Sequence, residues 1–232
     1  MARPTLGPRA GSRARLKVGV LISGRGSNLQ ALIEAAADPA YPAEIVLVIS
    51  NRPEAPGLVR AAGAGIANLS LAQPSREIFA AEADAALRQK GVELVALAGF
   101  MRILDTGFVE AWRDRLVNIH PSLLPAFPGL HPQRQALAAG VRFSGCTVHF
   151  VRAQIDSGPI IAQAVVPVDP QDDEARLSER ILAAEHRLYP MAVRLYAEGR
   201  LSIAGERVAI SGAVPPEIAV FNPLEALASA GG

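Results

Sequence analysis

The first hundred residues alternate between short apolar runs and segments with the apolar spacing of helices. Aliphatic runs without polar alternation are typical of strands covered on both faces, and they lie at residues 17–22, 45–49 and 94–98. Helical spacing lies at residues 28–37, 56–64 and 75–90. This order predicts an α/β fold with a mostly parallel, twisted sheet, helices on both faces and a ligand crevice at the carboxyl ends of the strands.

The second half of the chain extends this Rossmann-like pattern. Residues 116–120 and 146–151 have the character of two further strands near the crevice. A long helix is predicted over residues 173–198, with a kink at Pro190 because proline removes a helical hydrogen bond. Residues 201–211 have the pattern of a C-terminal hairpin that turns at residues 204–207.

The two ends of the chain differ in composition from the part between them. Residues 1–16 carry four arginines and no acid, with Pro and Gly but no apolar periodicity, so we expect a disordered basic tail. A nucleic-acid arm or a transit peptide is the alternative, although no amphipathic pattern supports either. We expect one folded catalytic domain over residues 17–211 and a Pro- and Ala-rich extension over residues 212–232.

Composition narrows the class of protein. Half of the 232 residues are hydrophobic, which is ample for the core of one domain. We see neither a membrane span nor the apolar region of a secretory signal, so we expect a cytoplasmic protein. The single cysteine, Cys146, excludes a disulfide within the chain and lies in an apolar strand pattern, which favours a small core residue over a nucleophile.

An amide and an imidazole lie two positions apart at the end of an apolar run. In a strand, Asn118 and His120 emerge on one side while Ile119 turns to the core, and Pro121 ends the regular ladder. An amide donor beside a group that takes up or delivers a proton suits a reaction in which a carbonyl oxygen becomes an oxyanion. The alternative is a pair of hydrogen-bonded surface residues.

A carboxylate follows the next predicted strand. Asp156 opens an Asp-Ser-Gly-Pro segment, and on that loop it can face His120. It would then favour the charged imidazole and fix the orientation of the ring, as a general acid requires. The alternative is a plain turn, because these four residue types are common turn formers.

The turn after the first strand is a candidate phosphate site. Its glycines let the backbone approach an anion, and the next helix presents free N–H groups. A dinucleotide loop predicts a third glycine where Asn28 stands, and an acid near the end of the second strand, where the chain reads Ser50-Asn51-Arg52. Both features are missing, so one phosphate held by Gly26, Ser27 and Asn28 fits better.

Several motifs in this order resemble the formyltransferase family that uses 10-formyltetrahydrofolate. The catalytic pattern is carried by Asn118, His120, residues 121–125 and residues 155–159. Residues 23–30, 98–104 and 185–190 are similar to the branch that formylates glycinamide ribonucleotide in purine biosynthesis. The resemblance, which runs from about residue 17 to about residue 200, implies that branch's reaction, with 10-formyltetrahydrofolate as co-substrate and no metal.

The resemblance also assigns binding roles. It implies that Glu185 contacts the glycinamide end of the ribonucleotide whose phosphate lies at the turn. It implies a folate site formed by Arg76, Met101, Arg102, Ile103, Leu104, Asn118, Arg152, Ala153, Gln154, Ile155 and Asp156. By their pattern alone, Glu185 and Arg76 are also compatible with solvated helix faces, and Ile103 and Leu104 with ordinary core.

One position departs from the family pattern. Ala126 stands where many bacterial relatives carry a lysine, so the positive charge of that loop is missing and Arg25 or Arg134 is a candidate substitute. His131 in the following segment is equally compatible with binding and with loop packing.

Three other functions would share some of these sequence features. Hydrolysis of formyltetrahydrofolate would be expected with a regulatory domain before the catalytic one, and formylation of an aminoacylated tRNA with a second, basic domain after it; this sequence has neither pattern. A nonenzymatic nucleotide-binding module would need only residues 23–28 and would leave Asn118, His120 and Asp156 unexplained. We therefore expect small-molecule substrates, no nucleic acid or membrane partner, and a monomer or homodimer.

Overall fold

A seven-stranded sheet forms the centre of the domain in this computed structural model, which describes residues 14–217 and 219–223. The strand order is β3-β2-β1-β4-β5-β6-β7. The strands are β1 (Leu16–Ile22), β2 (Ala43–Ser50), β3 (Asn68–Ser70), β4 (Leu94–Leu97), β5 (Leu116–His120), β6 (Phe143–Phe150) and β7 (Ile160–Pro167). The pairs from β3 to β5 are parallel, whereas β6 and β7 are antiparallel additions, so the predicted mostly parallel sheet is confirmed.

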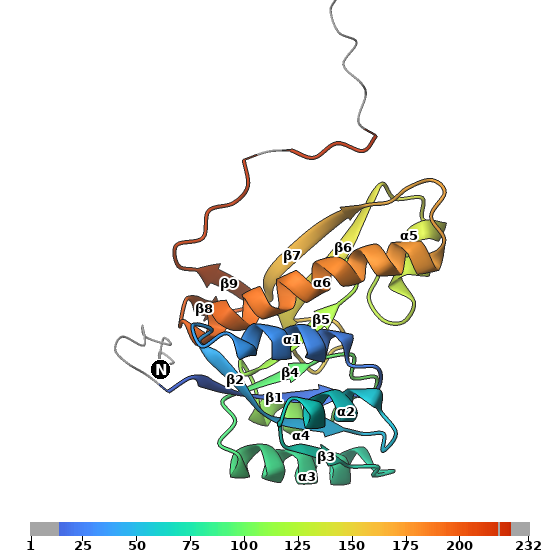
Figure 1. Cartoon of the computed structure of the whole chain (residues 1–232). Coiled ribbons are helices and arrows are strands. Elements are labelled where there is room, and N and C mark those ends of the chain that lie inside the picture. The colour runs from blue at the N-terminus through green and yellow to red at the C-terminus, as the bar shows by residue number, and fades with distance from the viewer. Residues whose placement is uncertain (1–13, 218, 224–232) are drawn as a thin grey trace, which may run out of the picture.

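Helices cover both faces of this sheet (Figure 1). They are α1 (Ser27–Ala37), α2 (Pro56–Gly63), α3 (Arg76–Gln89), α4 (Thr106–Ala111), α5 (Pro132–Ala138) and α6 (Glu174–Ala197). Strand alternation divides the core into two clusters: Val20 and Ile22 pack with α1 and α6, whereas Leu21 packs with α3 and α4. The long helix α6 lies beside α1 on one face of the sheet (Figure 1).

Local signals explain where the helices begin and end. The Ser75 hydroxyl accepts hydrogen bonds from the first backbone N–H groups of α3, and Asp105 and Asp173 cap α4 and α6 in the same way. After α3, Gly91 adopts a left-handed φ of 66°, which ends the helix at little cost. The long helix is continuous through Pro190, and the predicted kink there stays a prediction.

Four elements escaped the sequence interpretation, namely β3, α4, α5 and β7. Three of them are short: β3 has three residues, α4 six and α5 seven, too few for a clear periodicity. In β7 exposed and buried positions mix, because the strand lies at the edge of the sheet and pairs only with β6 among the described strands.

The ends of the domain refine the predicted boundaries. Leu16 is a buried residue of β1, and the Arg15 guanidinium donates to the carbonyls of Ala36 and Ala43. The sequence predicts both residues in the basic tail. They belong to the folded domain instead, because Leu16 is the first residue of β1 and Arg15 binds the first residue of β2. Residues 1–13 lie outside the described part of the chain, so their predicted disorder stays a prediction.

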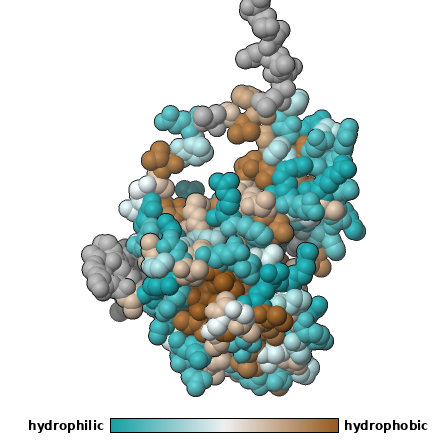
Figure 2. Space-filling model, viewed as in Figure 1, coloured by the Kyte–Doolittle hydropathy of each residue, from teal (hydrophilic) through white to brown (hydrophobic). Residues whose placement is uncertain are grey.

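The C-terminal hairpin is confirmed as β8 (Leu201–Ala204) paired with β9 (Arg207–Ile210). The segment after β9 extends from the hairpin toward the far ends of β6 and β7 (Figure 1 and Figure 2), where Asn222 donates to the carbonyls of Arg142 and Val168, and it carries apolar residues. They include Val214, Val220 and Phe221, which are all exposed. In the described residues, no helix combines the length and the apolar character that crossing a membrane would require.

Candidate active site

The end of β5 and the facing end of β6 bring an amide and an imidazole together. Asn118 and His149 are direct partners in the antiparallel pair of strands, which places their side chains next to each other. The Asn118 Nδ2 and His149 Nε2 atoms lie 3.3 Å apart. The other ring nitrogen of His149, Nδ1, lies 3.0 Å from the carbonyl oxygen of Phe150.

The surroundings of His149 fix its protonation. Burial lowers the pKa of this imidazole, which is 1% exposed, so the ring is neutral and carries one proton. That proton lies on Nδ1, because only a donor bonds to the Phe150 carbonyl, and Nε2 therefore accepts from the Asn118 amide. His149 thus sets which end of the Asn118 side chain is the donor. The sequence interpretation missed His149, because its pairing with Asn118 depends on the register of β5 and β6, which the sequence alone does not give.

His120 lies two residues further along β5, where two loops meet. Its Nε2 donates to the Phe127 carbonyl at 3.0 Å, and its Nδ1 lies 3.4 Å from Asp156 Oδ2. The same carboxylate oxygen accepts a hydrogen bond of 2.6 Å from the backbone N–H of Gly129. The ring is 5% exposed and has an acceptor at each nitrogen, an arrangement that orients it firmly. The structure thus brings the three predicted catalytic residues, Asn118, His120 and Asp156, into one cluster.

The turn between β1 and α1 is compact and rich in backbone donors. Gly26 has a φ of 71°, and a Cβ at this position would meet the Gly57 Cα at 2.8 Å, so only glycine fits. Ser27 is the first residue of α1, and no side chain caps the N–H groups there. The first turn of this helix therefore has the donors that a phosphate requires.

A buried polar pair joins that helix to α6. Asn28 Nδ2 donates to Glu185 Oε2 at 2.8 Å, and both side chains are buried. Burial raises the pKa of Glu185 to about 7, and the bond from Asn28 opposes this rise. Among the described residues, Asn28 Oδ1 has no hydrogen-bond partner. Glu185 is thus not the solvated residue that its helical position alone suggested.

The hydroxyl of Tyr189 fixes the position of α6 on the sheet. It lies 2.9 Å from the carbonyl of Leu97, the last residue of β4, and 3.3 Å from the carbonyl of Val117, which precedes Asn118 in β5. Glu185 precedes Tyr189 by one helical turn on the same face of α6. This contact places Glu185 one helical turn from a residue that is bonded to the carbonyl group preceding Asn118.

The segment after β4 presents apolar side chains to solvent. Met101 is 73% exposed and Ile103 is 56% exposed, whereas Leu104 packs against the core. The backbone N–H of Met101 donates to Ser23 Oγ at 2.8 Å, which ties this segment to the phosphate turn. Exposed apolar residues at a crevice suit a flat heterocycle, so the expected folate wall is compatible with Met101 and Ile103.

Two predicted folate residues, Arg76 and Arg102, have other contacts. Arg102 donates to the carbonyls of Gln73 and Pro74, and its guanidinium carbon lies 5.6 Å from the centre of the Phe79 ring. Arg76 is exposed, and its nearest charged partner in the described chain is Glu77 at 3.9 Å. Neither guanidinium contacts the catalytic cluster.

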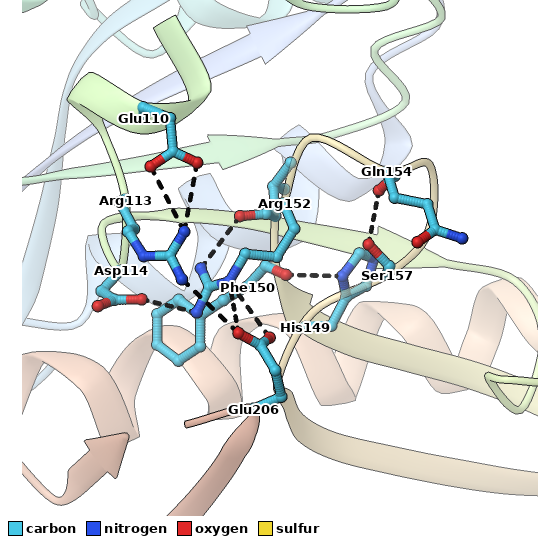
Figure 3. A network of polar contacts seen from close by, with 10 residues as sticks. Glu110, Arg113, Asp114, His149, Phe150, Arg152, Gln154, Ser157 and Glu206 are labelled. Carbon is cyan, nitrogen blue, oxygen red and sulfur yellow. Dashed lines mark hydrogen bonds and ion pairs between the residues drawn. The ribbon is translucent and has the colours of Figure 1, made fainter. Parts of the chain in front are cut away.

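The loop between β6 and β7 carries the remaining predicted folate residues. Ala153, Gln154 and Ile155 are exposed, whereas the Arg152 side chain turns away from them toward Asp114 and Glu206 (Figure 3). Asp156 adopts a φ of 47°, a conformation that aspartate tolerates better than most residues. That conformation turns the carboxylate of Asp156 toward His120.

The other sequence candidates have structural partners. Glu174, at the start of α6, lies 3.7 Å from His131 Nδ1 and 3.1 Å from Arg134 Nη2. Burial raises the pKa of the Cys146 thiol to about 12, in agreement with a core residue.

The chain is similar in sequence and fold to known proteins. The sequence model of the formyl transferase family matches residues 16–193. The trifunctional purine biosynthetic protein adenosine-3 of Drosophila pseudoobscura pseudoobscura is 54% identical over 200 residues, which are 84% of this chain and 15% of the relative. The chain thus spans less than a fifth of the length of that relative.

Two relatives of similar length match nearly end to end. Phosphoribosylglycinamide formyltransferase of Escherichia coli strain K12 is 43% identical, with 87% of this chain and 97% of the relative aligned. The crystal structure of glycinamide ribonucleotide transformylase 1 from Symbiobacterium toebii superposes with a TM-score of 0.82 at 52% identity and covers 84% of this chain and 94% of its own. Because the family match includes the strands that carry the Asn118 and His120 cluster, we conclude that the chain belongs to the formyl transferase family.

Proposed function

We propose that the protein transfers the formyl group of 10-formyltetrahydrofolate to the amine of glycinamide ribonucleotide, a step of purine biosynthesis. The observation that carries this proposal is the cluster of Asn118, His120 and Asp156 at one strand end, near the buried Asn28–Glu185 pair. The names of the nearly full-length relatives support the choice of substrates.

Asn118 acts on the formyl oxygen. As the amine attacks the formyl carbon, negative charge grows on this oxygen, and the Asn118 amide donates a hydrogen bond to it. His149 holds the amide with its donor end fixed, so no reorientation is needed while the charge forms. The Asn118 hydrogen bond therefore stabilises the transition state more than it stabilises the bound substrate.

His120 moves the proton. When bound, 10-formyltetrahydrofolate supplies the formyl group and takes up the proton that the amine gives up. His120 relays this proton, and Asp156 keeps the ring oriented through its Nδ1. The Nε2 proton is bonded to the Phe127 carbonyl here, so transfer requires His120 to exchange that bond for one to the substrate.

Glu185 and Asn28 position the amine. The carboxylate and the unpartnered Asn28 Oδ1 are acceptors, and an amine presents donors to both. The backbone N–H groups of Gly26, Ser27 and Asn28 hold the phosphate at the start of α1. The ribonucleotide thus spans from this turn to the end of β5.

The folate lies on the opposite side of the crevice. Residues 101–104 and 152–156 supply exposed apolar surface and main-chain groups for the pterin, and Met101, Ile103 and Ile155 are the most exposed apolar members. The reaction consumes small molecules, and we place the protein in the cytoplasm with its substrates.

One assay tests this proposal. The purified protein is mixed with 10-formyltetrahydrofolate, with and without glycinamide ribonucleotide, and released tetrahydrofolate and formylated ribonucleotide are measured together. We expect equal amounts of both products, formed only when the ribonucleotide is present. Equal deformylation without the ribonucleotide would indicate a hydrolase, and no deformylation in either mixture would contradict the proposal.

A further inference from the structure

Arg152 is the first residue of the loop that carries Asp156, and its charge is directed into the protein. Arg152 Nη2 donates to Asp114 Oδ1 at 2.9 Å, and Nε lies 3.3 Å from Glu206 Oε2 (Figure 3). Nη1 donates to the Val151 carbonyl at 3.2 Å. The Arg152 side chain is 10% exposed, so its charge is compensated by these groups and is not available to a ligand.

The stem of the Arg152 side chain also fills space at the base of the loop. Gly158 has a φ of 112°, and a Cβ there would lie 2.9 Å from Arg152 Cγ and 2.2 Å from the Phe150 carbonyl oxygen. The two ends of the loop are joined by the Phe150 N–H, which donates to the Pro159 carbonyl at 2.9 Å. Because the base of the loop is closely packed, a shift of Arg152 would displace both ends of the loop.

The two acidic partners come from different parts of the fold. Asp114 lies two residues before β5, the strand that carries Asn118 and His120. Glu206 lies in the turn of the β8–β9 hairpin, which is outside the residues that match the family model. Arg113 adds a second contact to Glu206 at 3.6 Å, and it binds Glu110 at 3.2 Å (Figure 3). Arg152 therefore connects the start of the catalytic strand, the Asp156 loop and the C-terminal hairpin.

From this geometry we propose that Arg152 is a positioning residue, held by Asp114 and Glu206, that sets the loop of residues 152–158 against His120 and the folate side of the crevice. The proposal rests on the function proposed above. It makes the C-terminal hairpin a structural part of the folate site, through the contact of Glu206 with Arg152. Asp114 is the stronger anchor, because it is less exposed than Glu206 and its contact with Arg152 is shorter.

Replacement of the arginine tests the anchor. Arg152→Met keeps the apolar stem beside Gly158 and removes the charge, whereas Arg113→Met removes the neighbouring guanidinium that contacts Glu206 but not the loop. Hydrogen exchange of the Phe150 and Val151 amides, which are hydrogen-bonded at the base of the loop, is measured without substrates. We expect at least about tenfold faster exchange in Arg152→Met and wild-type exchange in Arg113→Met.

Ligand measurements complete the test. In Arg152→Met we expect the Kd for tetrahydrofolate, measured by calorimetry, and the KM for 10-formyltetrahydrofolate to rise about tenfold, while the KM for glycinamide ribonucleotide changes less than about twofold. Glu206→Gln should give a smaller rise than Asp114→Asn, and Arg152→Lys should recover part of the loss.

These outcomes separate the two proposals. Unchanged loop exchange in both Arg152→Met and Asp114→Asn, or an equal rise of both substrate KM values, would overturn the positioning role of Arg152. Hydrogen exchange needs no substrate, so it tests the positioning role of Arg152 independently of the reaction. A wild-type protein that does not transfer the formyl group would overturn the proposed function, and the exchange result would still test the role of Arg152. Melting temperatures of all variants show whether faster exchange reflects unfolding of the whole domain. If Arg152→Met unfolds, the exchange rates of Arg152→Lys and Glu206→Gln are used in the same way to test the positioning role.

Discussion

The turn that we propose for the phosphate and the cluster that we propose for catalysis lie at the same edge of the sheet, yet they are built in opposite ways. The turn is one continuous segment, residues 23–28, whose conformation depends on glycine and the start of a helix. The cluster combines β5, β6 and the loop of residues 152–158, and each of its side chains is oriented by a residue from another segment. A contiguous site depends on local backbone geometry, whereas an assembled one depends on sheet register and loop position.

Hydrogen bonds join the turn to two other segments of the proposed substrate site, residues 101–104 and α6. Ser23 Oγ accepts from the Met101 N–H on the folate side, and Asn28 donates to Glu185 on α6. Changes in the turn should still affect mainly the binding of glycinamide ribonucleotide, because these hydrogen bonds involve only the side chains of Ser23 and Asn28, the first and last residues of the turn. Changes in the cluster should affect turnover itself.

The largest effect is expected in the cluster. His120→Ala should lower kcat by about 10² to 10⁴, the range for loss of a positioned acid or base, with little change in either Kd. Steady-state rates and calorimetric binding of both substrates measure this. The matched control is His131→Asn, an exposed histidine bound to Glu174, which keeps a residue that tolerates the left-handed φ of 55°. Near-normal turnover in His120→Ala would remove this residue from the mechanism.

The next largest effect concerns the stability of the protein and comes from Glu185, the buried residue of α6 that accepts from Asn28. The folded-state pKa of Glu185 is raised to about 7 from 4.5, so the native protein binds more protons than the unfolded chain between these values. Stability should therefore fall as pH rises through this window, by roughly 3 kcal/mol if the whole shift is expressed.

Glu185→Gln tests this pH dependence, because glutamine keeps the shape and cannot ionise. Urea unfolding from about pH 4.5 to about pH 7 should show a flatter free-energy profile for this variant than for the wild type. Glu179→Gln, an exposed change on the same helix, should keep the wild-type slope. Parallel profiles for all three proteins would mean that the carboxyl of Glu185 does not titrate in this window.

A smaller effect is expected at the phosphate turn. Ser27→Asp places a negative charge at the first position of α1, where it suits the helix dipole and repels a phosphate. The KM for glycinamide ribonucleotide should rise at least about tenfold, equivalent to roughly 1.4 kcal/mol, while the folate KM and the melting temperature stay near wild type. Ser27→Ala is the neutral control. A defect confined to folate would contradict the phosphate assignment.

Gly26 is a poor choice for the same test. Any side chain there meets Gly57 and forces a residue with a Cβ into a φ of 71°, so a loss of activity would reflect the fold as well as the ligand.

The smallest effect is expected outside both sites. Deletion of residues 1–13 should leave the melting temperature and both KM values almost unchanged, because this segment has no apolar periodicity with which to pack on the domain. The deletion stops before Arg15, which contacts the Ala43 carbonyl. A large loss of stability or activity would show that the arginines of this segment bind the fold or a substrate.

Local sequence patterns were sufficient to locate the long elements and one turn of this protein. Apolar runs and helical spacing located the long strands and helices, because those elements bury one face or two and leave a regular pattern. The turn of residues 23–28 was recognisable because glycine and a helix start act locally. Short elements such as β3 and α4 left too few residues for a pattern.

Contacts between distant segments follow from the folded structure and not from local sequence patterns. The sequence indicated Asn118, His120 and Asp156, partly through a family resemblance, but not that His149 fixes the Asn118 amide or that Asn28 and Glu185 form a buried pair. Asn28 and Glu185 are 157 positions apart, and such contacts follow from sheet register and helix packing rather than from any local propensity. The pKa of Glu185 near 7 has the same origin, since burial by distant segments, and not the neighbouring sequence, determines the cost of its charge.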